Sequence, residues 1–199
     1  GIDLTKDMIP VVPAAHYCCG GIKVDLNGES SIRRLYALGE ASSTGLHGGN
    51  RLASNSMMEA AVYADAAARH AISAIGGIEW QRDIPAWDDE GTAAPEEMAL
   101  ITQNYKEMQQ IMSNYVGIVR SNLRLERALR RLEIIFKENE ELYLKSTPTK
   151  ELCELRNMID VGYLIIKQAQ AMKRSIGLHY SLDYPIEMPA DAAPRKTST

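Results

Sequence analysis

The sequence predicts an α+β fold that is mainly α, in which short strands and one helix precede a three-helix bundle. Two observations point to this fold. Residues 1–55 hold short apolar runs separated by glycine pairs, among them Gly20-Gly21 and Gly48-Gly49, and such punctuation is typical of strands and tight turns. Residues 95–180 instead hold three long stretches in which apolar residues recur every three or four positions, which is the period of one helix face.

The expected strands of the first part are three apolar runs, at residues 10–12, 21–25 and 35–38. Each run is short and is bounded by turn-forming residues, as strands usually are. Asn27-Gly28 lies between the last two runs and is a common hairpin turn signal. We therefore expect strand pairing around this turn.

The expected helix of the first part is an alanine-rich stretch over residues 56–75. Asn55 or Ser56 can serve as its N-cap, and Glu59 stands in the capping-box position after Ser56. Gly76-Gly77 follows the last apolar turn and should end the helix. These signals end the first part of the chain, residues 1–77.

Residues 78–94 are expected to connect two packing units, because they hold both tryptophans and an acidic stretch but no apolar period. The bundle is assigned to residues 95–180. Residues 181–199 are expected to form a C-terminal tail, because residues 189–199 lack an apolar period altogether.

The bundle helices are expected over residues 95–120, over residues 122–144 and from Thr147-Pro148 onwards. The short links between them make neighbouring helices antiparallel. Their apolar stripes form the expected core: Met98, Ile101, Tyr105, Met108, Met112 and Tyr115 on the first helix, Leu125, Leu129, Leu132 and Phe136 on the second, and Leu152, Leu155, Ile159, Tyr163, Ile166 and Ala169 on the third.

A basic face lies on the second bundle helix and consists of Arg124, Arg127, Arg130 and Arg131. A solvated surface, in which these arginines pair with Glu126 and Glu133, explains the pattern most simply. A patch that docks a partner protein is the alternative.

The composition bounds the partners and the compartment. A net charge of −4, from 22 Lys+Arg and 26 Asp+Glu, gives no electrostatic reason to expect nucleic acid or an anionic membrane. No apolar run reaches the roughly 18 residues of a spanning helix, and residues 1–6 lack a signal-peptide pattern. Cys18, Cys19 and Cys153 cannot all pair, which favours a reduced compartment. We expect a cytoplasmic protein with no membrane and no nucleic-acid partner.

The candidate site residues lie before residue 60. Arg51 stands in a glycine-rich loop that leads directly into the expected helix, where backbone N–H groups and the helix dipole favour an anion and the guanidinium can grip a carboxylate or phosphate. Glu40 follows an expected strand and is placed to accept the hydroxyls of a ribose or ribityl chain. His16 stands near the Gly20-Gly21 pair, where backbone can approach a ligand closely.

Simpler explanations remain for two of these residues. His16 can be a hydrogen-bonded structural histidine, and Glu40 can belong to an ordinary turn. The usual metal-ligand spacings are absent, as are the P-loop and the G-x-S-x-G motif. We therefore expect no metal site, and nothing favours a hydrolase or a nucleotide triphosphatase.

Two segments closely resemble the C-terminal part of the succinate dehydrogenase and fumarate reductase flavoprotein family: IPVVPAAHYCCGGIKVD at residues 9–25 and LYALGEASSTGLHGGNRLASNSMMEA at residues 35–60. Finer features resemble the branch of that family that oxidises L-aspartate. Succinate dehydrogenases usually carry Met at the position of Cys19 and Gly at that of Ala53, and the ending GLHYSLDYP at residues 177–185 is also similar to the aspartate-oxidising branch.

The resemblance implies FAD as cofactor and the oxidation of L-aspartate to iminoaspartate, with hydride transfer to the flavin and with oxygen or fumarate as the acceptor. The product would pass to quinolinate synthase in NAD biosynthesis. By motif position, His16 and Arg51 would hold carboxylate oxygens of the substrate. Glu40 would contact ribityl or ribose hydroxyls, and Ser56 with Met57 would meet the flavin at the start of the helix.

Family members begin with a G-x-G-x-x-G turn for the FAD pyrophosphate, and this chain has no such motif. The resemblance therefore implies that residues 1–77 are the C-terminal piece of an FAD-binding α/β domain, and that the 199 residues alone neither retain FAD nor oxidise aspartate. Strand edges without sheet partners are candidates for pairing with a second copy of the chain.

Two other functions stay open. One is the flavoprotein subunit of a succinate dehydrogenase or fumarate reductase, which would need iron–sulfur and membrane partners. The other is a helical packing or interaction module, in which the bundle has no activity of its own.

Overall fold

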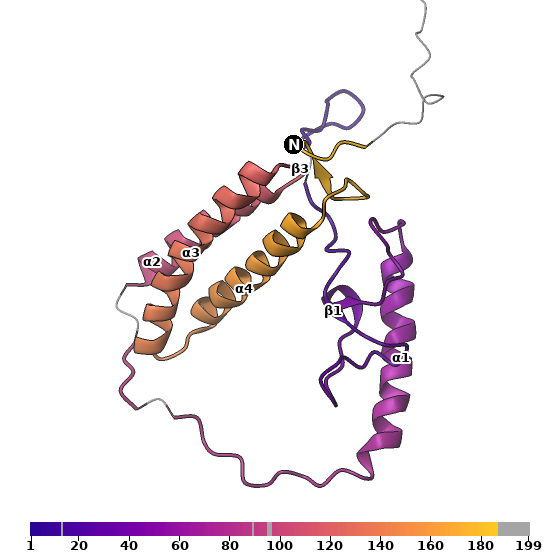
Figure 1. Cartoon of the computed structure of the whole chain (residues 1–199), viewed down its shortest axis with the longest axis vertical. Helices are drawn as coiled ribbons and strands as arrows, with labels where there is room; N and C mark the ends of the chain where they lie inside the picture. Colours follow the sequence, from indigo (N-terminus) through magenta and orange to yellow (C-terminus); the bar gives the residue numbers. More distant parts are fainter. Residues whose placement is uncertain (13, 89, 95–96, 187–199) are drawn as a thin grey trace, which may run out of the picture. The chain divides into compact units, whose positions relative to one another are not determined.

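A computed structural model of the chain describes residues 1–12, 14–88, 90–94 and 97–186 (Figure 1). The chain forms two compact units, Gly1–His70 and Ala71–Thr199. Helices dominate the described residues and the strands are short, so the predicted α+β, mainly α class is confirmed. No helix within the described ranges is long and apolar enough to span a membrane.

The first unit contains one short parallel strand pair. Strand β1 (Ile22–Lys23) pairs with β2 (Ser42–Ser43), so that Ile22 lies opposite Ser42. Gly21 precedes β1 with a φ of +151°, and a Cβ at this position would collide with the backbone of Ala41. Only glycine therefore allows the two segments to approach this closely.

Two of the three expected strands are wrong. Residues 10–12 are exposed and form no strand, and the run at residues 35–38 makes only an isolated antiparallel bridge between Tyr36 and Glu29. The physical reason is that an apolar run becomes a strand only where a partner completes its hydrogen bonds. The turn at Asn27-Gly28 is confirmed, because the Gly28 N–H donates to the carbonyl of Asp25 at 3.0 Å.

Helix α1 (Asn55–Ile75) follows and ends directly before Gly76-Gly77, as predicted. It starts at Asn55, so Ser56 lies inside the helix rather than capping it. The capping-box role of Glu59 is wrong. Its carboxylate contacts Thr44 and His47 instead, because these tertiary partners outcompete the local cap.

The second unit is built on three packed helices, α2 (Met98–Ile111), α3 (Asn122–Lys145) and α4 (Lys150–Ala171), which lie alongside one another in Figure 1. The first of them does not continue to residue 120 as expected. It changes into a π-helix, η2 (Met112–Val116), and then into strand β3 (Val119–Arg120), which pairs in parallel with β4 (Tyr180–Ser181).

The ends of the bundle helices differ in how well the sequence predicts them. Helix α3 matches its predicted range closely, and the hydroxyl of Ser121 caps it by accepting from the N–H of Arg124. Helix α4 starts later than the expected Thr147-Pro148, because the hydroxyl of Thr149 caps it. The expected start of the first helix, at Pro95, lies outside the described residues, and so do residues 187–199 of the tail expected at residues 181–199, whose first residue, Ser181, belongs to β4.

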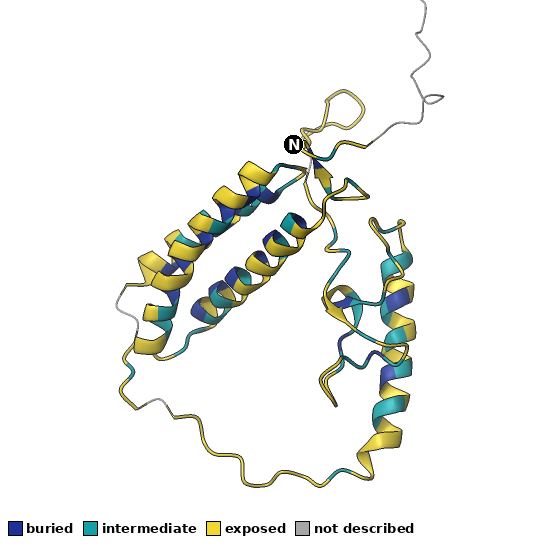
Figure 2. Ribbon diagram, viewed as in Figure 1, coloured by how far each residue is buried: buried dark blue, intermediate teal, exposed yellow. Residues whose placement is uncertain are grey.

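The core of the second unit lies between the facing sides of its helices, where Figure 2 shows the buried positions. Most predicted stripe residues are in this core. Met98, Tyr105, Phe136 and Tyr163 are wrong, since they are exposed rather than packed between the helices. The prediction also omitted Ala128 and Ile135, because a helix that packs against two neighbours buries a wider face than a single stripe.

Candidate functional site

Glu40 links two segments of the first unit. It lies in η1 (Gly39–Ala41), a short 3-10 helix directly before β2, and its Oε1 accepts a hydrogen bond from the N–H of Cys18 at 2.9 Å. The residue is exposed, and its Oε2 receives no hydrogen bond from another described residue. One carboxylate oxygen is therefore free to accept a hydroxyl from a ligand.

A buried acid–imidazole pair fastens the glycine-rich loop to α1. Nε2 of His47 lies 2.6 Å from Oε2 of Glu59, and the two side chains are only 9% and 2% exposed. The hydroxyl of Thr44 donates to the other oxygen, Oε1 of Glu59. Both oxygens of this buried carboxylate thus have a partner, which is what a buried charge requires.

Tyr17 lies between His47 and Arg51. Its ring meets the His47 ring edge-on, with 5.4 Å between the ring centroids and an interplanar angle of 90°. The guanidinium carbon of Arg51 lies 4.6 Å from the centroid of the Tyr17 ring. Burial raises the pKa of the Tyr17 phenol, and the nearby carboxylates of Glu59 and Glu40 raise it further. The phenol therefore stays neutral at physiological pH, and its ring is a cation–π partner for Arg51.

Arg51 has capacity left for an anion. Its Nη1 donates to the carbonyl of Leu52 at 3.2 Å, while its buried Nε has no hydrogen-bond partner. No carboxylate of the described chain pairs with this guanidinium. Both ring nitrogens of His47 are likewise buried without a hydrogen bond of suitable geometry, so the close approach of Nε2 to Glu59 is an ion-pair contact. A planar guanidinium with unused donors suits a carboxylate or a phosphate.

The other sequence-predicted site residues lie on the surface of the same unit. His16 is exposed and makes no hydrogen bond or ion pair with a described residue. Ser56 is half-buried in the first turn of α1, and Met57 beside it is 80% exposed. The structure thus joins Arg51 to Tyr17, the neighbour of His16, but records no contact that joins His16, Glu40 and Met57 to Arg51.

Sequence reasoning missed three residues of this cluster: Tyr17, His47 and Glu59. The signal for His47 was its place in the same loop as Arg51. The signal for Glu59 was a single acidic residue in the alanine-rich start of α1, which local capping rules explained too easily.

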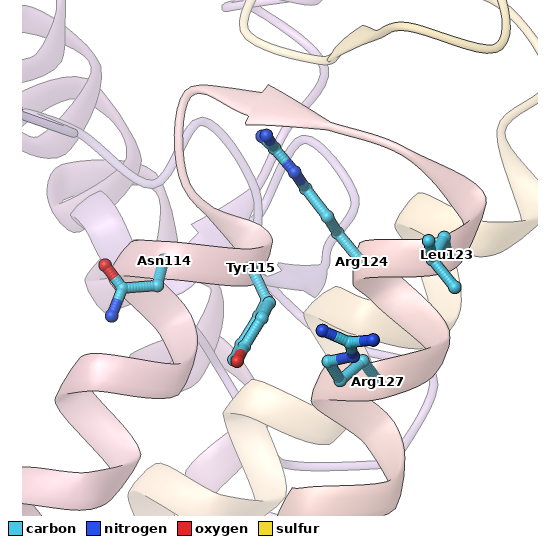
Figure 3. Close-up of a pocket in the computed structure, with 5 residues that line it drawn as sticks. All are labelled: Asn114, Tyr115, Leu123, Arg124 and Arg127. Carbon is cyan, nitrogen blue, oxygen red and sulfur yellow. The ribbon is translucent and has the colours of Figure 1, made fainter.

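A second candidate site lies in the other unit. A hollow of about 350 Å³ is lined by Asn114, Tyr115, Leu123, Arg124 and Arg127. Figure 3 shows the side chains of Tyr115, Arg124 and Arg127 around this hollow, between the π-helix η2 and the start of α3. Arg124 donates to the carbonyl of Val119 at 2.8 Å, whereas no described carboxylate pairs with Arg127.

The expected pairing of the basic face is confirmed only for Arg130, whose guanidinium lies 2.5 Å from the carboxylate of Glu126. Glu133 pairs with Lys137 at 3.0 Å instead. Arg131 stacks over the ring of Tyr115 at 5.6 Å. The basic face therefore has two sides. On the neutralised side, Arg130 is paired with Glu126, and on the side toward η2, Arg127 and Arg131 have no carboxylate partner among the described residues.

The described residues contain no cluster of His, Cys, Asp and Glu that could hold a metal ion. Cys18 is exposed and Cys19 is half-buried, and neither forms a disulfide.

Two segments of the chain match the models of known protein families. Residues 1–57 match the model of an FAD binding domain, and residues 105–197 match that of a fumarate reductase flavoprotein C-terminal domain. The chain belongs to the succinate dehydrogenase and fumarate reductase flavoprotein family, and it carries part of an FAD-binding domain. The predicted resemblance is therefore confirmed.

Within this family, similar sequences include proteins named L-aspartate oxidase. The chain is 43% identical to that of Vibrio cholerae over 98% of its own length and 49% identical to that of Acinetobacter baylyi over 93%. It spans only 36% and 34% of those two proteins, about a third of their length.

The solved structures that resemble the chain include fumarate reductases. A quinol-fumarate reductase with menaquinol molecules superposes with a TM-score of 0.76 and 28% identity, over 94% of this chain and 36% of the other. A quinol fumarate reductase from E. coli gives a TM-score of 0.74 and 28% identity, over 92% and 34%.

Proposed function

We propose that the chain is part of an FAD-dependent enzyme that oxidises L-aspartate to iminoaspartate. The observation that carries this proposal is the guanidinium of Arg51, which is stacked on Tyr17 and unmatched by any described carboxylate. A substrate with two carboxylates needs such a group. The relatives named L-aspartate oxidase support the choice of amino acid.

The residues present fit an FAD. The exposed oxygen of Glu40 can accept a ribityl or ribose hydroxyl. Gly45 and Gly48 have open space where a side chain would stand, so the backbone of the loop can approach a ligand. The exposed side chain of Met57 offers an apolar contact to a ring system at the start of α1. When bound, FAD supplies the hydride acceptor for the reaction.

The chain's own groups then bind and orient the substrate. Arg51 holds one carboxylate of L-aspartate with charge-assisted hydrogen bonds, and exposed His16 donates a further hydrogen bond to a carboxylate oxygen. Ser56 and Met57 meet the flavin at the start of α1. Holding the substrate in a fixed pose lowers the entropy cost of the transfer step.

Oxygen or fumarate is the proposed acceptor that reoxidises the enzyme. The proposed product, iminoaspartate, hydrolyses to oxaloacetate unless it is consumed, and quinolinate synthase in NAD biosynthesis is its proposed consumer. The cytoplasm is the proposed compartment for both steps.

The test uses the full-length reading frame that contains this chain, purified with FAD. We expect L-aspartate-dependent formation of hydrogen peroxide and little reduction of a dye with succinate. The opposite result, turnover of succinate with inert aspartate, would assign the protein to the respiratory branch and direct the search to an iron–sulfur partner subunit. The structural similarity to fumarate reductases leaves the respiratory branch as the alternative. The chain is 28% identical to one of those structures, whereas it is up to 49% identical to the relatives named L-aspartate oxidase.

A second role is supported by the hollow beside η2. We propose that the bundle is also an interaction module, in which an acidic segment of a partner protein binds at this hollow and Arg127 forms an ion pair with one of its carboxylates. An Arg127→Glu variant should then lose a partner that the wild-type protein retains on gel filtration at low salt, while an Arg130→Glu variant, altered on the neutralised side, should keep it. Equal behaviour of both variants and the wild type would leave the bundle as a packing unit.

A further inference from the structure

The buried pair of Glu59 and His47 has an effect beyond the glycine-rich loop that it joins to α1. A carboxylate that is 2% exposed is costly unless its environment replaces the lost water. Helix α1 is alanine-rich at this point, and an alanine in place of Glu59 would avoid the cost. The buried carboxylate is therefore explained by its two contacts, with the ring of His47 and with the hydroxyl of Thr44.

The contacts form one continuous chain from α1 to Arg51. Thr44 and His47 are fastened to Glu59, the edge of the His47 ring packs against Tyr17, and Tyr17 lies under the guanidinium of Arg51. Glu59 touches neither Tyr17 nor Arg51 through any hydrogen bond or ion pair among the described residues. The direct contacts of Glu59 therefore lead to Arg51 only by way of the His47 and Tyr17 rings.

An arginine side chain is long and has many rotamers, so its binding strength depends on how well it is held before the ligand arrives. The Arg51 side chain makes two contacts of note. It stacks on the Tyr17 ring, and its only hydrogen bond to a described residue is the one to the carbonyl of Leu52. The Tyr17 ring is therefore the main constraint on the guanidinium plane, and the ring in turn packs against His47 of the buried pair.

We propose that Glu59, His47 and Tyr17 are positioning residues that pre-orient Arg51 for a dicarboxylate. This inference rests on the proposed function, in which Arg51 binds a carboxylate of L-aspartate. None of these three residues needs to touch the substrate. They act by reducing the conformational freedom of Arg51, which improves affinity without adding a contact.

The first test is Glu59→Gln in the full-length flavoprotein. The amide keeps the shape of the side chain but removes the charge that holds His47. We expect the KM for L-aspartate to rise about tenfold with kcat within about threefold of wild type, because ground-state and transition-state binding of the carboxylate weaken together. The FAD content should match the wild type, and the Tm reports how far the loss of the buried charge destabilises the fold. Glu126→Gln is the matched control, since it breaks an exposed carboxylate–arginine pair on α3 and should leave KM unchanged.

The second test separates the ring of Tyr17 from its hydroxyl, and it stands even if Glu59→Gln fails to fold. Tyr17→Leu removes the ring and should raise the KM about tenfold, whereas Tyr17→Phe keeps the ring and should restore it to within about twofold. Equal KM values for Tyr17→Leu and the wild type would overturn the proposal. Equal losses in Tyr17→Leu and Tyr17→Phe would overturn it as well, because they would assign the effect to the hydroxyl.

Titration with succinate by calorimetry gives a readout that needs no turnover. The dissociation constant of this dicarboxylate should rise about tenfold in Glu59→Gln and in Tyr17→Leu. A wild-type enzyme that binds succinate but does not oxidise L-aspartate would contradict the proposed function alone. An active wild type whose variants bind succinate equally well would contradict the positioning role alone.

Discussion

The guanidinium of Arg120 donates a hydrogen bond from Nη1 to Nδ1 of His179 across 2.9 Å, and its Nε donates to the carbonyl of Val116 at 2.8 Å. This contact joins strand β3 to the turn that precedes β4. Because a guanidinium can only donate, Nδ1 must accept, and His179 must be neutral for the bond to form. The C-terminal segment is therefore held to the bundle by a histidine that cannot carry a proton on that nitrogen.

The stability of the second unit should decrease at acid pH because of this bond. Burial lowers the pKa of His179 below its ordinary 6.5, and the charge of Arg120 lowers it further. Above pH 6.5 the histidine is neutral in both the folded and the unfolded chain, so the full stability is present. As the pH falls below that value, the unfolded chain binds the proton first, and stability is lost toward the lowered pKa of the folded state. Thermal melts between pH 8 and pH 5 measure the decline. A His179→Gln variant that declines just as steeply would assign the effect to other groups.

Loss of Arg51 should cost turnover without loss of the flavin. Arg51→Ala removes the proposed charge-assisted contact to a substrate carboxylate, worth about 1.5–3 kcal/mol, so kcat/KM should fall roughly 10- to 150-fold. Steady-state kinetics and the flavin absorbance of the purified full-length protein measure both quantities. Arg130→Ala is the control, because Arg130 lies on the exposed surface of α3 in a pair with Glu126. Activity of Arg51→Ala within about twofold of wild type would remove Arg51 from the site.

Replacing Asn139 with leucine should stabilise the bundle. Asn139 is 1% exposed on α3, and neither its amide nitrogen nor its amide oxygen has a hydrogen-bond partner in the described structure. An unsatisfied buried amide costs about 1–3 kcal/mol, so an apolar side chain of similar size should raise the free energy of unfolding by about 1 kcal/mol or more. Denaturant unfolding measures the change, with the exposed Asn157→Leu on α4 as control. A destabilised Asn139→Leu would mean that the amide bonds to something essential, such as a buried water.

The 199-residue chain alone should not retain FAD. Residues 1–57 match only part of what holds the cofactor, and no G-x-G-x-x-G turn is present to bind the pyrophosphate. We expect the chain, purified with excess FAD and desalted, to be colourless, and the full-length protein to be yellow under the same treatment. Gel filtration of the colourless chain also tests whether its uncovered strand edges pair two copies. A flavin spectrum that survives desalting of the short chain would contradict the prediction.

Local patterns in the sequence were enough for the helices of the chain. The range of α3 follows from its apolar period and from Ser121 as a cap, and the end of α1 follows from Gly76-Gly77. Each of these signals acts between residues a few positions apart, so the chain needs no distant partner to express it. The motifs around Arg51 likewise identified the flavoprotein family, because close similarity in sequence needs no coordinates.

Tertiary structure alone decided which residues surround Arg51. Tyr17, His47 and Glu59 come from three separate segments, and only their packing brings an acid, an imidazole and a phenol ring into one cluster. It also decided that the run at residues 35–38 forms no strand and that the first bundle helix gives way to η2 before residue 120. Strand pairing and buried ion pairs depend on partners far along the chain, and a period or a cap within one segment carries no information about them.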